Sequence, residues 1–206
     1  MKIIYIQWGI ILDNLLELLV ERIGEKRAEH SIRVMDTAVK LASHYSSDIN
    51  KARIAGALHD CAKYRDKSYL LKRASDFGII LDKTMIINYQ LIHGPLGAKV
   101  AEDEFGIEDE EILDAIRYHT TGRENMSLLD KIVYMADYIE PSRNFSGVEL
   151  ARQLAFKDLD EGLIYAMNNT ILDLIKTNKL IHLDTIKARN YLVSKKLYSS
   201  LNLWIN

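Results

Sequence analysis

The sequence predicts an all-α fold in a single domain. The chain has two prolines and ten glycines among 206 residues, so few residues interrupt helices. Apolar side chains recur at helical spacing through most of its length. A chain of this length is typical of one domain with a sizeable core. We therefore expect a helical bundle in which polar side chains at helix ends can meet in a cleft.

Capping residues and periodicity set the expected order of helices. Asp48 and Ser127 suit helix starts, Gly78 and Gly106 suit helix ends, and Pro95 suits a first turn. The expected helices cover residues 15–23, 25–45, 50–62, 67–77, 95–105, 109–119, 128–139, 159–175 and 185–197, with a further short helix after residue 148. The first helix is expected to be capped by Asp13 or Asn14 and to end at Gly24.

Composition limits the classes of function. The formal charge of −2 and the absence of a basic tract argue against a nucleic-acid partner. The apolar stretch 1–12 is too short to span a bilayer and lacks a signal-peptide cleavage site, so no membrane partner is expected. A single cysteine, Cys61, fits a reducing compartment, and we interpret it as a small buried residue. These features predict a cytoplasmic protein.

His59 and Asp60 stand side by side at the end of an apolar run, Ala55 to Leu58. Both are good ligands for a divalent metal. An unpaired carboxylate in a protein core costs several kcal/mol or shifts its pKa. Taken alone, the pair fits an exposed helix end better than a buried site. Four further polar residues in helix-like settings change that balance: His30, His93, His119 and Asp137.

Three of these four residues have two interpretations each. His30 lies on the apolar side of its helix, where a histidine is more often a satisfied core group than a ligand. His93 precedes Gly94-Pro95, so it is either a polar loop residue or a side chain that points into a cleft. Asp137 lies beside a buried stripe, which is costly unless the carboxylate is paired or metal-bound.

The order His…His-Asp…His…His…Asp resembles the HD-domain metal-dependent phosphohydrolases. The resemblance runs from about His30 to Arg143 and includes a His-Asp-x-x-Lys motif that ends at Lys63. It implies an HD-domain helical bundle with a metal site in a central cleft. The implied organisation is an N-terminal segment and short helix over 1–24, an HD core over 25–145, and C-terminal helices over 146–206 that pack on the same domain.

Three further strings are similar to the YqeK-type branch, which splits diadenosine tetraphosphate symmetrically into two ADP. They are Leu-Ile-His-Gly-Pro-Leu-Gly-Ala at 91–98, Ile-Arg-Tyr-His-Thr-Thr-Gly at 116–122 and Ala-Asp-Tyr-Ile-Glu-Pro at 136–141. The resemblance implies a dinucleoside polyphosphate as substrate. It also implies a divalent metal cofactor, expected as two irons, although the same ligand types accept manganese, zinc or nickel.

The resemblance also assigns roles by position. His30, His59, Asp60 and Asp137 match the four common ligands, and His93 and His119 match the pair that holds a second metal, with Asp60 as the bridge. Two metals roughly 3.5–4 Å apart can hold a bridging water and lower its pKa, so a metal-bound hydroxide would attack phosphorus.

Lys63 is the candidate that stabilises the transferring phosphoryl group, although a lysine at a helix end also suits the helix dipole. The other candidate phosphate contacts are Arg27, Arg33, Thr120, Arg123 and Arg143. Each arginine fits an ordinary surface charge equally well, and Thr120 fits a helix cap.

Two other functions remain open on the sequence. A related HD phosphohydrolase could act on a nucleoside mono-, di- or triphosphate or on a cyclic nucleotide, because the ligand set does not specify the leaving group. A non-catalytic nucleotide sensor is the third interpretation. Loss of a ligand would indicate such a sensor, and all six ligand positions are occupied.

Overall fold

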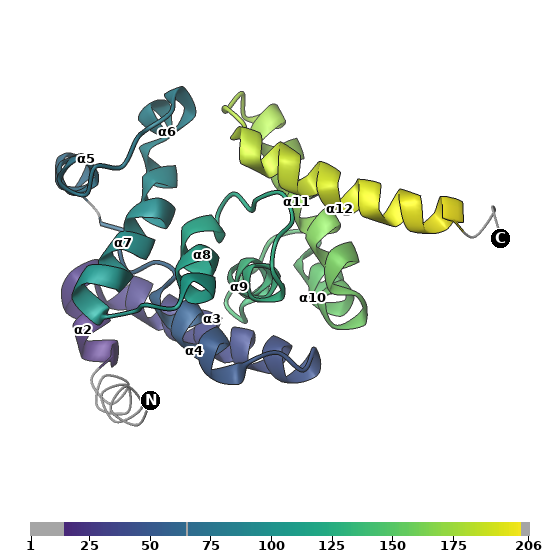
Figure 1. Ribbon diagram of the computed structural model, residues 1–206, viewed down its shortest axis with the longest axis horizontal. Coiled ribbons are helices and arrows are strands. Elements are labelled where there is room, and N and C mark those ends of the chain that lie inside the picture. The colour runs from purple at the N-terminus through teal and green to yellow at the C-terminus, as the bar shows by residue number, and fades with distance from the viewer. Residues whose placement is uncertain (1–14, 65, 203–206) are drawn as a thin grey trace.

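The computed structural model describes residues 15–64 and 66–202, and every regular element within them is a helix (Figure 1). The all-α prediction is therefore confirmed. The expected caps Asp13 and Asn14 and the stretch 1–12 lie outside the described residues. The helices are α2 (Leu15–Ile23), α3 (Glu25–His44), α4 (Ile49–Leu58), α5 (Lys67–Asp76), α6 (Lys83–Ile87), the 3₁₀ helix η1 (Tyr89–Ile92), α7 (His93–Phe105), α8 (Glu110–Tyr118), α9 (Leu128–Ile139), α10 (Val148–Lys157), α11 (Leu159–Lys176) and α12 (Leu183–Asn202).

Helix starts follow the expected capping chemistry. The Asp48 carboxylate accepts hydrogen bonds from two amides in the first turn of α4. Ser127 and Asp130 form a reciprocal capping box at the start of α9. The expected helix 50–62 is wrong at its end, because α4 stops at Leu58 and residues 59–62 form turns. The His59 ring bonds to the Gly56 carbonyl there, which takes an acceptor that a longer helix would use.

Helix α3 lies at the centre of the fold and packs against α2, α4 and α9. It approaches α4 closely at Gly56, where an added Cβ would meet the Met35 Cα at 2.9 Å. Helix α8 packs against α4, α7 and α9 and completes the core. Because these helices cross closely, the ends of α4 and α8 face the buried sides of α3 and α9.

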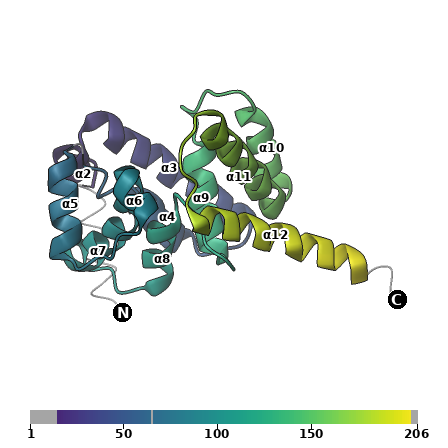
Figure 2. The same cartoon turned by 90° about the horizontal axis from the view of Figure 1, so that it is seen from above.

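The C-terminal helices α10 and α11 pack on α9, and the start of α12 lies along α11 (Figure 2). The rest of α12 projects away from the body of the molecule. The division into residues 1–24, 25–145 and 146–206 stays a prediction.

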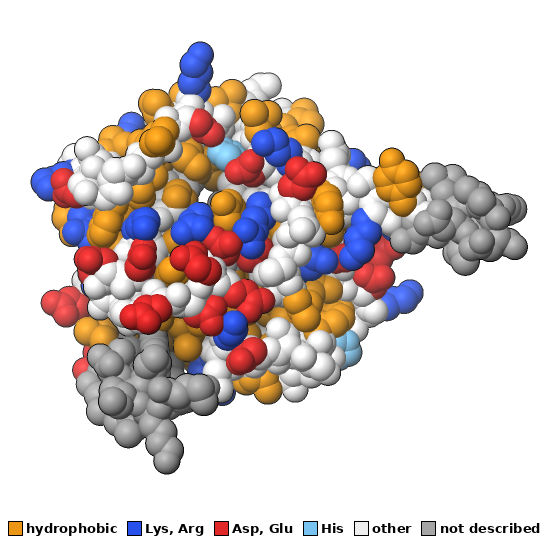
Figure 3. Space-filling model, viewed as in Figure 1, with side chains coloured by type: hydrophobic (Ala, Val, Ile, Leu, Met, Phe, Trp, Pro, Cys, Tyr) orange, Lys and Arg blue, Asp and Glu red, His pale blue; other side chains and the backbone are white. Residues whose placement is uncertain are grey.

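Acidic and basic side chains are interspersed on the face of the molecule in Figure 3. Among the described residues, the structure contains no helix that is both long and apolar enough to cross a membrane.

Candidate metal centre

Six side chains from five parts of the chain meet in the interior, and we call them the His/Asp cluster. His30 comes from α3 and Asp137 from α9, while the others stand at the ends or starts of helices. The cluster consists of His30, His59, Asp60, His93, His119 and Asp137. The four histidines and Asp60 are buried, and the Asp137 side chain is partly exposed. The structure thus brings together all six residues that the sequence selected.

Three of the histidines are oriented by the helix that each one follows. His59, His93 and His119 occupy the C-cap positions of α4, η1 and α8. Carbonyls at a helix end lack partners within the helix. The Nδ1 atoms of His59 and His119 each lie 2.7 Å from the carbonyl three residues earlier, and His93 Nδ1 pairs with Gln90 in the same way. If Nδ1–H donates there, Nε2 presents its lone pair to the cluster.

His30 is oriented differently because it lies inside a helix, where the backbone carbonyls are already bonded. Its Nδ1 pairs with Glu140 Oε1 at 3.2 Å. Glu140 is fully buried and also accepts hydrogen bonds from Arg33 Nε at 3.0 Å and from the Ser142 amide at 2.7 Å. Burial alone would raise the pKa of Glu140, but the bonds from Ser142, His30 and Arg33 hold it below its ordinary value.

Glu140 is a functional candidate that the sequence analysis missed. The available signal was a carboxylate directly before Pro141, one turn beyond Asp137. Its partner His30 is 110 residues away in the sequence, so spacing could not reveal the contact.

Asp60 connects two halves of the cluster. Its Oδ1 lies 3.0 Å from His93 Nε2 and 3.5 Å from His119 Nε2. Its Oδ2 lies 3.5 Å from His59 Nε2 and 3.9 Å from His30 Nε2. Asp137 Oδ1 joins the second half, 3.0 Å from His30 Nε2 and 4.0 Å from His59 Nε2. Each carboxylate oxygen of Asp60 therefore faces a different pair of histidines.

The donor set fits divalent metal ions. The Nε2 atoms of His30 and His59 and the Oδ1 atom of Asp60 are buried and make no hydrogen bond within the described residues. Ligand atoms of three overlapping triads lie within 4.8 Å of one another. Buried lone pairs that converge without donors are costly unless a cation satisfies them. Imidazole and carboxylate together suit iron, manganese, zinc or nickel.

The protonation states of Asp60, Asp137 and His93 also suit metal binding. Burial alone would raise the pKa values of Asp60 and Asp137, but the neighbouring histidines hold both well below the ordinary value. Burial and the nearby charge of Lys63 lower the pKa of His93 to about 4. At neutral pH both carboxylates are ionised and His93 is neutral, the forms in which these groups bind metals.

Several predicted phosphate contacts surround the cluster. Arg27 pairs with Asp60 Oδ2 at 2.9 Å, and Arg143 pairs with Asp137 Oδ1 at 2.5 Å. Lys63 Nζ lies 3.1 Å from His93 Nε2. Thr120 Oγ1 lies 3.0 Å from His119 Nε2.

Arg123 lies elsewhere. Its guanidinium pairs with Asp130 and Asp114, each at 2.7 Å, and stacks over the Tyr118 ring. The structure does not bring it to the cluster, so its contact with substrate stays a prediction.

A cleft of about 690 Å³ reaches the cluster at His30, and we call it the basic cleft. Its charged lining includes Lys26, Arg27, Arg33, Lys63 and Arg143. Of these, Lys26 was not selected from the sequence. This volume lies within the range of roughly 300–1,000 Å³ that small-molecule sites occupy, and five cations suit a polyanionic ligand.

The fold and the centre together define an all-α, metal-dependent hydrolase. The HD domain family model matches residues 27–142, and the chain belongs to the HD domain family. It is 45% identical over 180 residues to a symmetrical bis(5'-nucleosyl)-tetraphosphatase of Halalkalibacterium halodurans, covering 86% of this chain and 95% of that protein. It is 42% identical to the protein of the same name from Bacillus subtilis, covering 88% and 97%.

A solved structure agrees with the fold. The crystal structure of a "predicted HD superfamily hydrolase involved in NAD metabolism" from Clostridium acetobutylicum superposes with a TM-score of 0.86 at 47% identity. The match covers 89% of this chain and 97% of that one. These similarities confirm the resemblance to the YqeK-type branch.

Proposed function

We propose that the protein is a symmetrical bis(5'-nucleosyl)-tetraphosphatase that hydrolyses diadenosine tetraphosphate to two ADP. One observation carries the proposal: the carboxylate of Asp60 joins two histidine pairs, and His30 of one pair lines a cleft that also carries five cations. The names of the relatives from H. halodurans and B. subtilis support the same substrate.

The reaction adds one water across the central phosphoric anhydride. The bond between one inner phosphorus and the central bridging oxygen breaks, and the oxygen of water joins that phosphorus. The bridging oxygen leaves with the second ADP. Bound divalent metals supply Lewis acidity that activates water and neutralises phosphate charge. The proposed ligands are the six residues of the His/Asp cluster, and the proposed metals are two irons, with manganese, zinc or nickel as alternatives.

The chain's own cations are proposed to bind and orient the phosphates. Lys63 lies beside His93 and Asp60, so its charge can offset the negative charge that develops at the reacting phosphate. Arg27 forms an ion pair with Asp60, and Arg143 forms one with Asp137, so both lie next to the cluster. Arg33, which also lines the cleft, forms an ion pair with Glu140. Thr120 is proposed to hydrogen-bond a phosphate oxygen near His119.

Metal analysis and product chromatography on one anaerobically purified sample test the proposal. Near two irons per chain and ADP as the sole product are expected. Turnover of another nucleotide without release of ADP from diadenosine tetraphosphate would favour a different HD phosphohydrolase. No turnover of any nucleotide by metal-loaded protein would leave a non-catalytic sensor. The cytoplasmic location stays a prediction.

A further inference from the structure

The basic cleft runs along α3 with His30 at its middle. Lys26 and Arg27 lie four and three residues before His30, and Arg33 lies three residues after it. All four line the cleft, so they lie on or beside one face of the helix. With a rise of about 1.5 Å per residue, Lys26 and Arg33 are about 10 Å apart along the helix axis. His30, the member of the His/Asp cluster that lines the cleft, therefore lies between two arms of the cleft.

The first arm lies towards the start of α3. Lys26, Arg27 and Lys63 supply its charge, and Tyr64 forms part of its wall. The Tyr64 hydroxyl lies 3.4 Å from Arg22 Nη1, at the end of the helix that precedes α3. The Tyr64 ring is held edge-on against Tyr69, with 4.9 Å between ring centroids. An aromatic side chain that is 9% exposed thus forms part of the cleft wall beside the cations of this arm.

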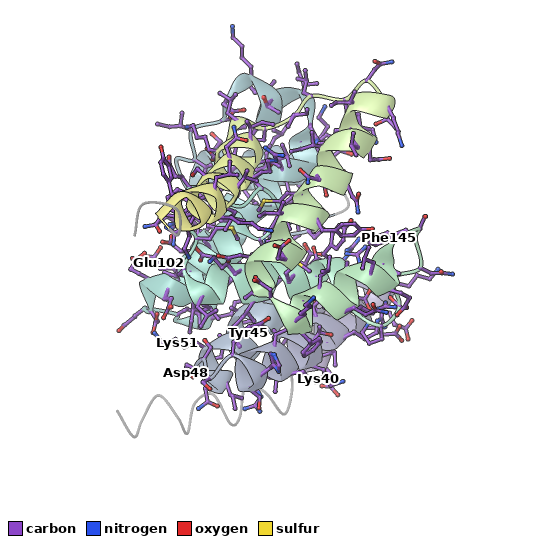
Figure 4. The ribbon with its side chains drawn as sticks, turned by 90° about the vertical axis from the view of Figure 1, so that its right-hand side faces the viewer. Lys40, Tyr45, Asp48, Lys51, Glu102 and Phe145 are labelled. Atoms are coloured by element: carbon purple, nitrogen blue, oxygen red, sulfur yellow. The ribbon has the colours of Figure 1, made fainter. Side chains whose placement is uncertain are left out.

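The second arm lies beyond His30, where Arg33 meets the connection between α9 and α10. Arg33 and Arg143 both approach Glu140, at 3.0 and 3.6 Å. Phe145 lines the cleft two residues after Arg143, packs edge-on against Tyr138 and is 39% exposed. Figure 4 shows Phe145 at the edge of the molecule. This arm also combines cations with an aromatic ring.

We infer that each arm binds one nucleoside diphosphate half of the substrate, with one base on Tyr64 and the other on Phe145. Bases stack on aromatic rings whatever their sequence, because every base has a π-face. Binding the two halves in separate arms would place the central anhydride at the cluster between them. The inference rests on the proposed function, and it gives a reason why cleavage would yield equal products.

The test uses Phe145→Ala and Tyr64→Leu, singly and together. The matched control is Phe156→Ala, because Phe156 is also 39% exposed but lies on α10 outside the cleft. We expect each single variant to raise KM for diadenosine tetraphosphate about tenfold, the scale of one lost stacking contact. The double variant should raise KM further, and the control should leave it unchanged.

Inhibition by a ligand that carries only one base tests whether the two arms bind bases independently. Adenosine 5'-tetraphosphate can place its base in either arm, so each single variant should change its inhibition constant by less than about threefold. The double variant should weaken it about tenfold. Inorganic tripolyphosphate, which has no base, should inhibit all variants equally. The inference is overturned if the single variants leave KM for diadenosine tetraphosphate unchanged, or if one single variant weakens the one-base ligand as much as the double variant does.

If Tyr64→Leu fails to fold, Phe145→Ala alone still tests the second arm, because an unchanged KM for diadenosine tetraphosphate in that variant overturns the inference. A wild-type protein that releases no ADP but binds adenosine tetraphosphate contradicts the proposed function. In that case the dissociation constants of the same variants still test the two arms.

Discussion

Among single residues, the four histidines of the cluster are oriented by two different kinds of hydrogen-bond partner. His59, His93 and His119 use carbonyls left free at helix ends, which their own helix supplies. His30 lies inside α3 and depends on Glu140, a carboxylate from another element. A carboxylate partner also makes the imidazole a stronger donor to a metal than a carbonyl partner does.

Replacement of Glu140 should therefore weaken metal binding. We expect Glu140→Ala to lower metal affinity about 10- to 100-fold, because His30 loses the group that fixes its ring and tautomer. Competition with a chelator of known affinity measures the change. The control is Glu149→Ala, which removes a glutamate whose side chain is 74% exposed and should leave metal affinity unchanged. Equal affinities in the two variants would contradict this role of Glu140.

His93→Ala should remove one metal and retain the other. His93 Nε2 approaches Asp60 Oδ1, while His30, His59 and Asp137 lie on the other half of the cluster. Elemental analysis should show a fall from near two metals to near one per chain, together with loss of most hydrolase activity. His44→Ala replaces an exposed histidine outside the cluster and should retain both metals. An unchanged metal content in His93→Ala would place His93 outside the ligand set.

At the scale of elements, the crossing of α3 and α4 fixes the distance between His30 and the His59-Asp60 pair. Gly56 permits this crossing, since a Cβ there would lie 2.9 Å from the Met35 Cα and 3.2 Å from the Ala38 Cβ. The nearest atom belongs to the backbone, so a rotamer change cannot relieve the contact. The helices would have to separate.

Gly56→Ala should thus reduce both stability and metal binding. We expect unfolding free energy to fall by about 1–3 kcal/mol, the usual cost of overpacking, and metal content to fall with it. Gly106→Ala is the comparison: Gly106 has φ +66° and open space around it, so it should cost about 1–2 kcal/mol from backbone conformation alone and keep its metals. Urea unfolding and elemental analysis measure both effects. Full metal content in Gly56→Ala would contradict the link between this crossing and the cluster.

At the scale of the whole molecule, the proposed centre joins helices that are distant in the sequence. The proposed ligands come from α3 and α9 and from the ends of α4, η1 and α8. A metal that binds only the folded chain stabilises it by about 2.7 kcal/mol when its free concentration is 100 times Kd. The buried lone pairs of the cluster would lose their partner when the metal is removed.

Metal removal should consequently lower the melting temperature of the wild type. Addition of a chelator is expected to lower Tm by several degrees, and addition of excess divalent metal should reverse the change. Asp60→Asn, which lacks the shared carboxylate charge, should show a much smaller response. A wild-type Tm that is the same with and without chelator would argue against a metal centre that spans these helices.

The all-α class and the six cluster residues were both evident from the amino-acid sequence. Both results depend on information that is local in the chain: helix caps such as Asp48 and Ser127, apolar periodicity, and the resemblance carried by short motifs around His59 and Asp137. Such patterns involve residues within a few turns of one another, so they can be recognised in the sequence without knowing how the helices pack.

The contact partners of these side chains, in contrast, are known from the folded structure alone. Glu140 meets His30 across 110 residues, Lys26 faces the cleft because of how α3 is rotated, and Arg123 is bound by Asp114 and Asp130 away from the cluster. An arginine in a sequence looks the same whether it faces phosphate or a carboxylate of its own chain. Helix crossing and rotation, set by close contacts such as that at Gly56, make the difference.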